Sequence, residues 1–267
     1  MAVTLTVLAS GSRGNSAVVR SASTSILVDA GLSCRETLRR MREVGEDPAR
    51  LSAIVISHEH SDHVSGLAVL AKKLRLPVFM TDATCAAWQR GLPDAKTPEF
   101  VLHYHHSFQA GRGFTVGDIE ISSFTIPHDA ADPVGFTFRA GGMRLAIVTD
   151  LGYVPASVRE HVRGCDLLMI ESNHDLEMLR GGPYPWSVKQ RVMSRVGHLS
   201  NEALADFFTD DYDGGAAFVV LAHLSEQNNH PELARRTAER ALDGKRNLVH
   251  NRLVLAAQDR PLAPIVL

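Results

Sequence analysis

The chain has 267 residues, of which 45% are hydrophobic and 22% are charged, and its formal net charge is -2. These values are typical of a folded protein with a sizeable core, and they exclude most disordered, collagen-like and fibrous classes. They also exclude a protein that is basic over its whole surface, although a local basic groove remains compatible with them. Histidine is frequent, with 13 residues, which points to metal binding or acid-base chemistry.

Strands dominate the predicted elements before residue 150. Residues 3–9 alternate as a strand, a glycine-rich turn follows at 10–16, and strands at 17–20 and 25–29 complete a predicted β-meander. A helix is predicted over 33–44, because Ser33 and Glu36 have the spacing of a capping box. The other predicted elements are strand 53–56, helix 64–74, strand 77–80, helix 82–90, and strands 100–105, 114–116, 120–126, 135–139 and 144–149.

Helices are more frequent after residue 150. The pattern predicts a helix at 155–162, a buried strand at 166–170, two or three helices between 175 and 209, a strand at 216–221 and a last helix at 231–242. No linker, repeat or low-complexity tract divides the chain. We therefore expect one α/β (α+β) domain over residues 1–267, with two sheets between helical layers.

The cysteines and the hydropathy pattern indicate the cellular compartment of the protein. Cys34, Cys85 and Cys165 are odd in number and far apart, so neither a disulfide framework nor a cysteine zinc site is expected. No signal peptide and no apolar run long enough to span a membrane are recognisable. The sequence thus predicts a cytoplasmic protein with no membrane partner.

A histidine-rich segment directly follows the predicted strand 53–56. In Ser57-His58-Glu59-His60-Ser61-Asp62-His63, His58 and His60 stand two residues apart, so an extended backbone points both rings to one side, toward one ion. Asp62 and His63 follow where the chain turns into a helix, and can face a second ion. Imidazole and carboxylate ligands suit Zn²⁺ or Mn²⁺. We therefore expect two divalent metal ions, either Mn²⁺ or Zn²⁺.

The His-x-His-x-Asp-His pattern resembles the metal-binding motif of the metallo-β-lactamase fold, and four further motif residues occur in the expected order. The resemblance implies a four-layer αβ/βα sandwich with two mixed β-sheets between helical layers. It also implies that Asp29 orients the ligands and that Asp150 bridges the two ions. The implied ligands are His58, His60 and His128 at one ion, and Asp62, His63 and His223 at the other, with Asp150 shared.

Further segments are similar to the YycJ/WalJ family of bacterial metal-dependent 5′-to-3′ DNA exonucleases. That resemblance implies a dinuclear, Mn²⁺-dependent nuclease, in which a metal-bridging hydroxide attacks the phosphodiester and Asp62 takes part in catalysis. The segments are Val7-Leu8-Ala9-Ser10-Gly11-Ser12-Arg13-Gly14-Asn15-Ser16, Glu171-Ser172-Asn173-His174-Asp175, Gly197-His198-Leu199-Ser200-Asn201 and His223-Leu224-Ser225-Glu226-Gln227-Asn228-Asn229.

Two histidines are candidates for the general acid. Glu171 and His198 resemble a glutamate segment and a histidine segment that precede the last metal histidine in the related tRNase Z. We predict that His198, held by Glu171, protonates the departing 3′ oxygen, and His174 is the second candidate. The cluster at residues 103–106, which contains three further histidines, is predicted to be an exposed strand without a metal.

Substrate contacts are predicted at the glycine-rich turn and between the two histidine segments. Arg13 and Lys189 could reach a substrate phosphate, and Ser10, Ser12 and Asn15 could add hydroxyl and amide donors. Aromatic residues make up only 6% of the chain, which argues against a long base-stacking surface. The expected partner is therefore DNA bound through its backbone, with a strong dependence on salt.

Three alternatives stay open at this stage. RNA remains a possible substrate, because neither the motif spacing nor the composition shows whether a 2′-hydroxyl is recognised. The same fold could also hydrolyse a small thioester, lactone, lactam or cyclic phosphodiester, although such a site would not need the histidines and the glutamate between residues 171 and 201. A non-catalytic partner subunit is disfavoured, since all seven ligand positions are intact.

Overall fold

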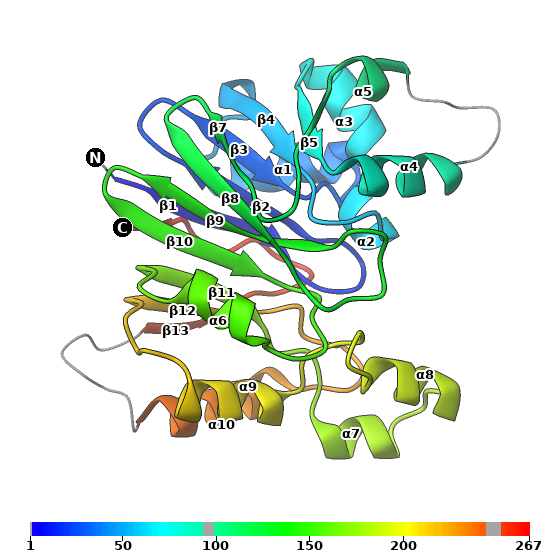
Figure 1. Cartoon of the computed structure of the whole chain (residues 1–267), viewed down its shortest axis with the longest axis vertical. Helices are drawn as coiled ribbons and strands as arrows, with labels where there is room; N and C mark the ends of the chain where they lie inside the picture. Colours follow the sequence, from blue (N-terminus) through cyan, green and yellow to red (C-terminus); the bar gives the residue numbers. More distant parts are fainter. Residues whose placement is uncertain (1, 93–98, 244–251) are drawn as a thin grey trace.

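The computed structural model describes residues 2–92, 99–243 and 252–267. Two seven-stranded β-sheets pack face to face, and helices cover both outer faces, as Figure 1 shows. The predicted four-layer sandwich with two mixed sheets is therefore confirmed. None of the helices in the described part of the chain is long and apolar enough to cross a membrane.

The first sheet contains strands from both ends of the chain. Strands β1, β2 and β3 form the predicted meander, and β3 to β6 continue it in parallel. Its order is β14 (Ile265–Val266), β1 (Thr4–Ala9), β2 (Ser16–Arg20), β3 (Ser25–Val28), β4 (Leu51–Val55), β5 (Val78–Met80) and β6 (His105–Ser107).

The second sheet is antiparallel from β7 to β10 and parallel from β10 to β13. Because parallel strands end at the same edge of a sheet, β10, β11 and β12 deliver the residues that follow them to one edge. Its order is β13 (Arg252–Leu255), β12 (Phe218–Ala222), β11 (Leu167–Glu171), β10 (Met143–Val148), β9 (Val134–Ala140), β8 (Ile119–Thr125) and β7 (Gly113–Val116).

Helices α1, α3, α4 and α5 lie over the first sheet, and α6, α9 and α10 lie over the second, whereas α7 and α8 extend beyond one end of the sandwich (Figure 1). A 3₁₀ turn, η1 (Pro48–Arg50), precedes β4. The helices are α1 (Cys34–Glu43), α2 (Ser61–Val64), α3 (Leu67–Leu74), α4 (Asp82–Arg90), α5 (Glu99–His103), α6 (Ala156–Val162), α7 (Leu176–Gly181), α8 (Trp186–Val192), α9 (Asn201–Asp210) and α10 (Pro231–Asp243).

Strand β3 shows why the hydrophobic runs of this chain form buried strands. Ile26 and Val28 face the core between the sheets, while Leu27 points the other way, into the core under the helices. Both faces of the strand are buried, so the sequence reads as a continuous apolar run and not as an alternation. The predicted N-cap is also confirmed, because the Ser33 side chain accepts a hydrogen bond from the Glu36 backbone N–H, while the Glu36 carboxylate accepts from Arg39 and Arg40.

Some predicted elements are wrong. Residues 100–105 were expected to form one strand, but they belong to α5 and the start of β6. Phe100 and Tyr104 are four residues apart, their rings stack with centroids 4.4 Å apart, and Val101 is fully buried, so a short helix satisfies this pattern better. The last predicted helix was expected to end the regular structure, yet β13 and β14 follow it and complete the sheets.

A third difference concerns the predicted helix 64–74, which the structure divides into α2 and α3. The division occurs at Gly66, where a Cβ atom would lie 1.9 Å from the carbonyl oxygen of Leu32. The backbone of Gly66 also donates a hydrogen bond of 2.8 Å to the carbonyl of Ala30. This contact holds the histidine-rich segment against the loop that follows β3.

Candidate metal centre

The motif residues from both sheets converge at one end of the sandwich. They follow β3, β4, β8, β10 and β12 directly or by a few residues. Asp29, Asp150 and His223 adopt left-handed backbone conformations, with φ of 59°, 63° and 55°. For a residue with a side chain this conformation costs about 1–2 kcal/mol, so the surrounding structure must enforce it. Such strain typically accompanies functional sites.

His58, His60 and His128 form the first ligand group, with their ligand atoms within 4.8 Å of one another. His128 donates through Nδ1 to the Gly197 carbonyl at 3.1 Å, and His60 donates through Nε2 to the Asp129 carbonyl at 3.2 Å. Their remaining nitrogens, His128 Nε2 and His60 Nδ1, lie 3.2 Å apart. Two lone pairs therefore face each other across this short gap.

Asp62, His63, Asp150 and His223 form the second group. The Nδ1 atom of His63 donates to Asp29 at 2.9 Å, so its Nε2 faces Asp150 Oδ2 at 3.2 Å and Asp62 Oδ2 at 3.4 Å. His223 Nε2 lies 3.4 Å from the same oxygen of Asp62. Two carboxylates and two imidazole nitrogens thus converge in a largely buried space.

These two groups fit divalent cations. Burial lowers the pKa values of His58 and His128, so both rings offer lone pairs. His58 Nε2 and Asp150 Oδ2 are buried, and no described residue hydrogen-bonds to either atom. Burial alone would lower the pKa of His63, but the neighbouring carboxylates, Asp150 first, raise it well above its usual value. The same carboxylates would attract a divalent cation, which would displace this proton on binding.

Glu171 lies beside the second group and links two histidines. Its Oε1 atom accepts hydrogen bonds of 2.8 Å from Nδ1 of both His198 and His223. Its Oε2 atom accepts from the backbone of Leu151 and Leu199. Burial opposes ionisation of Glu171, but His198 and the hydrogen bonds lower its pKa to about 2. Glu171 is therefore an anion that fixes both rings.

Comparison with known proteins identifies the family. Residues 24–224 match the family model described as "Beta-lactamase superfamily domain". The chain is 41% identical over 249 residues to "Exodeoxyribonuclease YycJ" of Bacillus anthracis, covering 92% of this chain and 91% of that protein. This chain belongs to the YycJ/WalJ family of the metallo-β-lactamase superfamily. Members of this superfamily bind divalent metal ions, and the two ligand groups fit that property.

Two further similarities agree with the family. "Exodeoxyribonuclease WalJ" of Streptococcus pneumoniae is 38% identical over 231 residues, covering 86% of this chain and 85% of that protein. The fold resembles that of the metallo-β-lactamase fold protein YhfI from Bacillus subtilis, with a TM-score of 0.70 and 18% identity over 98% of each chain.

In this YycJ/WalJ family member Ser57 connects the candidate metal ligands, a role that the sequence did not reveal. Ser57 Oγ lies 2.9 Å from Asp29 Oδ2 and 3.0 Å from His58 Nδ1. Its backbone N–H donates to Asp29 Oδ1 at 2.8 Å. Asp29 therefore orients His63 directly and His58 through Ser57. The position of Ser57, immediately before the first motif histidine, was the available signal.

The glycine-rich turn contacts the second ligand group mainly through Asn15 and Ser10. The Asn15 amide donates to Asp62 Oδ2 at 3.0 Å and lies 3.0 Å from His63 Nε2, while Ser10 Oγ accepts from the backbone N–H of His223 at 2.8 Å. Ser12 is exposed. The exposed guanidinium of Arg13 pairs with Glu226. Ser10 and Asn15 thus contact candidate metal ligands in this structure.

Lys189 and His174 occupy positions that the sequence did not anticipate. Lys189 is buried, and its Nζ donates to the Arg180 carbonyl at 2.7 Å, so this ammonium caps α7 and is not directed at the ligand groups. His174 is buried beside Asn173, and burial lowers its pKa to about 4. Asn173 was also missed by the sequence analysis, and its amide donates to the His223 carbonyl at 2.8 Å.

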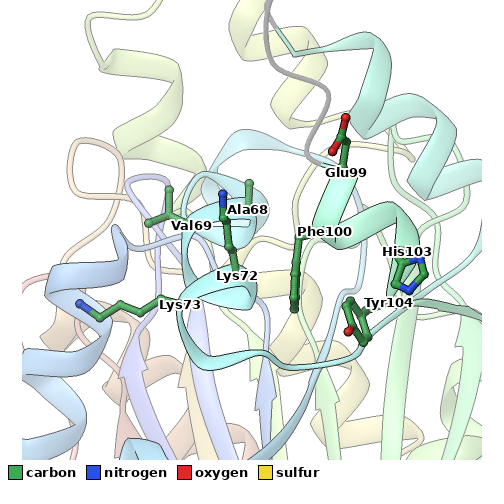
Figure 2. Close-up of a pocket in the computed structure, with 8 residues that line it drawn as sticks. All are labelled: Ala68, Val69, Lys72, Lys73, Glu99, Phe100, His103 and Tyr104. Atoms are coloured by element: carbon green, nitrogen blue, oxygen red, sulfur yellow. The ribbon is translucent and has the colours of Figure 1, made fainter.

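A large surface cavity, of about 880 Å³, lies apart from both ligand groups, between α3 and α5 (Figure 2). No member of either ligand group lines it. His103 borders this cavity, whereas His105 donates through Nε2 to the Met80 carbonyl at 3.0 Å. The described part of the chain holds no metal-ligand group there. The residues that line it are Ala68, Val69, Lys72, Lys73, Glu99, Phe100, His103 and Tyr104.

Proposed function

We propose that this protein is a metal-dependent exodeoxyribonuclease that degrades DNA from its 5′ end. The observation that carries the proposal is the 41% identity, over nearly the whole chain, to a relative named as an exodeoxyribonuclease. The two adjoining ligand groups support it, because paired divalent ions suit phosphodiester hydrolysis. The three cysteines are free and buried, which supports the reducing cytoplasm as the compartment.

The site would hold two metal ions, either Mn²⁺ or Zn²⁺. His58, His60 and His128 would hold one, Asp62, His63 and His223 would hold the other, and Asp150 would be shared between them. Bound there, the ions would activate water and neutralise charge on the phosphoryl oxygens. Asp62 and Asp150 supply negative charge to this centre, while Asp29, Ser57 and Glu171 keep the imidazole rings in their orientation.

His198 is the proposed proton donor to the leaving 3′ oxygen. Its side chain is 22% exposed, so it can meet a substrate, and its ring centroid lies 5.2 Å from that of His128 and 5.1 Å from that of His223. Burial would lower the pKa of His198, but the Glu171 carboxylate raises it above the ordinary value. The second candidate, His174, is buried and has a lowered pKa, which favours His198.

Digestion of end-labelled DNA tests the proposed activity. After removal of metals with EDTA, the protein is incubated with Mn²⁺ or Zn²⁺ and with DNA labelled at the 5′ or the 3′ end. We expect early release of the 5′ label as a nucleotide, while the 3′ label stays on a shortening strand. Earlier release of the 3′ label would contradict the direction. Release from RNA alone would identify RNA as the substrate. The absence of release from either polymer would refute the proposed nuclease activity.

Substitution of the proton donor gives a second prediction. H198A should lower kcat on DNA by about 10²–10⁴-fold, the usual contribution of a positioned general acid. On bis(p-nitrophenyl) phosphate the loss should be much smaller, because p-nitrophenolate leaves without a proton. H174A serves as the matched control and should affect both substrates alike. An equal loss on both substrates for H198A would show that His198 is not the acid.

A further inference from the structure

Arg191 lies on α8, beside the first ligand group, although 63 residues separate it in sequence from His128. Its Nε atom donates to Asp129 Oδ2 at 2.6 Å. The other carboxylate oxygen of Asp129 lies 3.5 Å from His128 Nε2, the nitrogen that faces the ligand group. One carboxylate therefore separates this guanidinium from the candidate metal centre.

The guanidinium of Arg191 is well placed to contact a second molecule. Its side chain is 65% exposed, and among the residues that the structure describes only its Nε has a recorded partner. A guanidinium carries five N–H donors in a planar fork, so the two terminal nitrogens remain available. Asp129 meanwhile restrains the side chain, which reduces the entropy that binding would cost.

The other cations near the centre lie in different surroundings. Lys189, which lies on α8 like Arg191, is buried, and its ammonium caps α7. Arg13 pairs with Glu226 on the side of the second ligand group. Arg195 lies over the ring of Tyr153, with 4.1 Å between its Cζ atom and the ring centroid. Among these cations, Arg191 combines exposure, a fixed orientation and a carboxylate contact that reaches His128.

We propose that Arg191 binds a phosphate of the substrate strand next to the scissile one, with Asp129 as the residue that positions it. The proposal rests on the nuclease activity proposed above and names a substrate contact for it. Arginine matches the geometry of a phosphate with two parallel N–H···O bonds, and phosphate contacts set the register of a strand in a site. The neighbouring phosphate is either the 5′-terminal group or the next internal one.

Each variant for the test replaces one side chain. R191Q removes the guanidinium, R191K keeps the charge and loses the fork, and D129N removes the negative charge that holds the guanidinium in position. R180Q is the matched control, because Arg180 is an exposed arginine on neighbouring α7 that pairs with Glu177. Each protein is assayed on DNA oligonucleotides with a 5′-phosphate or a 5′-hydroxyl, on bis(p-nitrophenyl) phosphate, and for metal content.

For R191Q we expect kcat/KM on DNA to fall about 10- to 100-fold, the usual effect of losing a hydrogen bond to a charged group. R191K should fall between R191Q and the wild type. The small diester has no neighbouring phosphate, so its hydrolysis and the metal content should stay unchanged. A loss confined to 5′-phosphorylated DNA would identify the terminal phosphate, and an equal loss on both oligonucleotides would identify the internal one.

A binding measurement separates this proposal from the nuclease itself. With EDTA present, a fluorescein-labelled single strand is titrated at several salt concentrations. R191Q should bind more weakly than R180Q. The negative slope of log K against log salt should become less steep by about 0.7 in R191Q than in R180Q, which is the value for one phosphate contact on a single strand. Equal binding by R191Q and R180Q would overturn the proposal whether or not DNA is cleaved. A loss of metal and of diester hydrolysis in R191Q would also overturn it.

Discussion

Replacing Asp150 with asparagine is expected to abolish metal-dependent hydrolysis, with a loss of at least about 10³-fold in kcat/KM. Asp150 is buried, and its carboxylate lies 3.2 Å from His63 Nε2 and 3.3 Å from His223 Nδ1. Burial opposes its ionisation, but His223 and His63 hold the pKa of Asp150 well below its usual value. The substitution removes this anion at the point where the two ligand groups meet.

Asparagine is the informative substitution because it keeps the size of the side chain and tolerates the left-handed backbone at φ of 63°. D150A adds a backbone cost of about 1–2 kcal/mol, so comparison of the two variants separates charge from strain. Metal content, activity on DNA and the increase of Tm on metal addition should be measured together. Undiminished activity of D150N would contradict the two-metal mechanism.

The second large effect is expected on stability. D29A should lower the free energy of unfolding by about 3–5 kcal/mol, because removing one partner of a buried charged network leaves the other groups unsatisfied. Asp29 accepts from the Ser57 backbone at 2.8 Å and from His63 Nδ1 at 2.9 Å, and alanine is disfavoured at its φ of 59°. Urea unfolding in EDTA measures this loss without a contribution from metal binding.

D29N is the matched control for this experiment. Its amide oxygen can still accept one hydrogen bond and it tolerates the backbone conformation, so its unfolding free energy should fall less than that of D29A. Both variants should bind metal about 10- to 100-fold more weakly, since His63 and His58 lose their orientation. If D29A unfolds at the wild-type urea concentration, the network of Asp29, Ser57 and His63 does not stabilise the fold.

Local patterns were enough for much of the fold. The apolar run of β3, the N-cap at Ser33 and the helix over 82–90 were predicted near their observed bounds. The errors came where a short pattern fits two structures. Residues 100–105 satisfy both a strand and a helix, and only packing of Val101 in the core decides for α5.

Tertiary structure also decided which basic and acidic groups meet. The sequence favoured Lys189 as a phosphate contact, yet Lys189 is buried against the Arg180 carbonyl, whereas Arg191 on the same helix reaches Asp129. His174 and His198 were rival proton donors, and contact with Glu171 distinguishes them. These differences depend on contacts between segments far apart in the chain. The local periodicity of a sequence does not predict such contacts.

The sequence by itself determined the family, the layered fold and the segment from His58 to His63, because residue spacing fixes which side chains share one side of a short backbone segment. Only the tertiary structure decided that Ser57 joins Asp29 to His58, that Glu171 also holds His223, and that Arg191 stands beside the candidate metal centre. The physical reason is that hydrogen bonds and burial orient these side chains, and both depend on strand ends that meet only after the two sheets have packed.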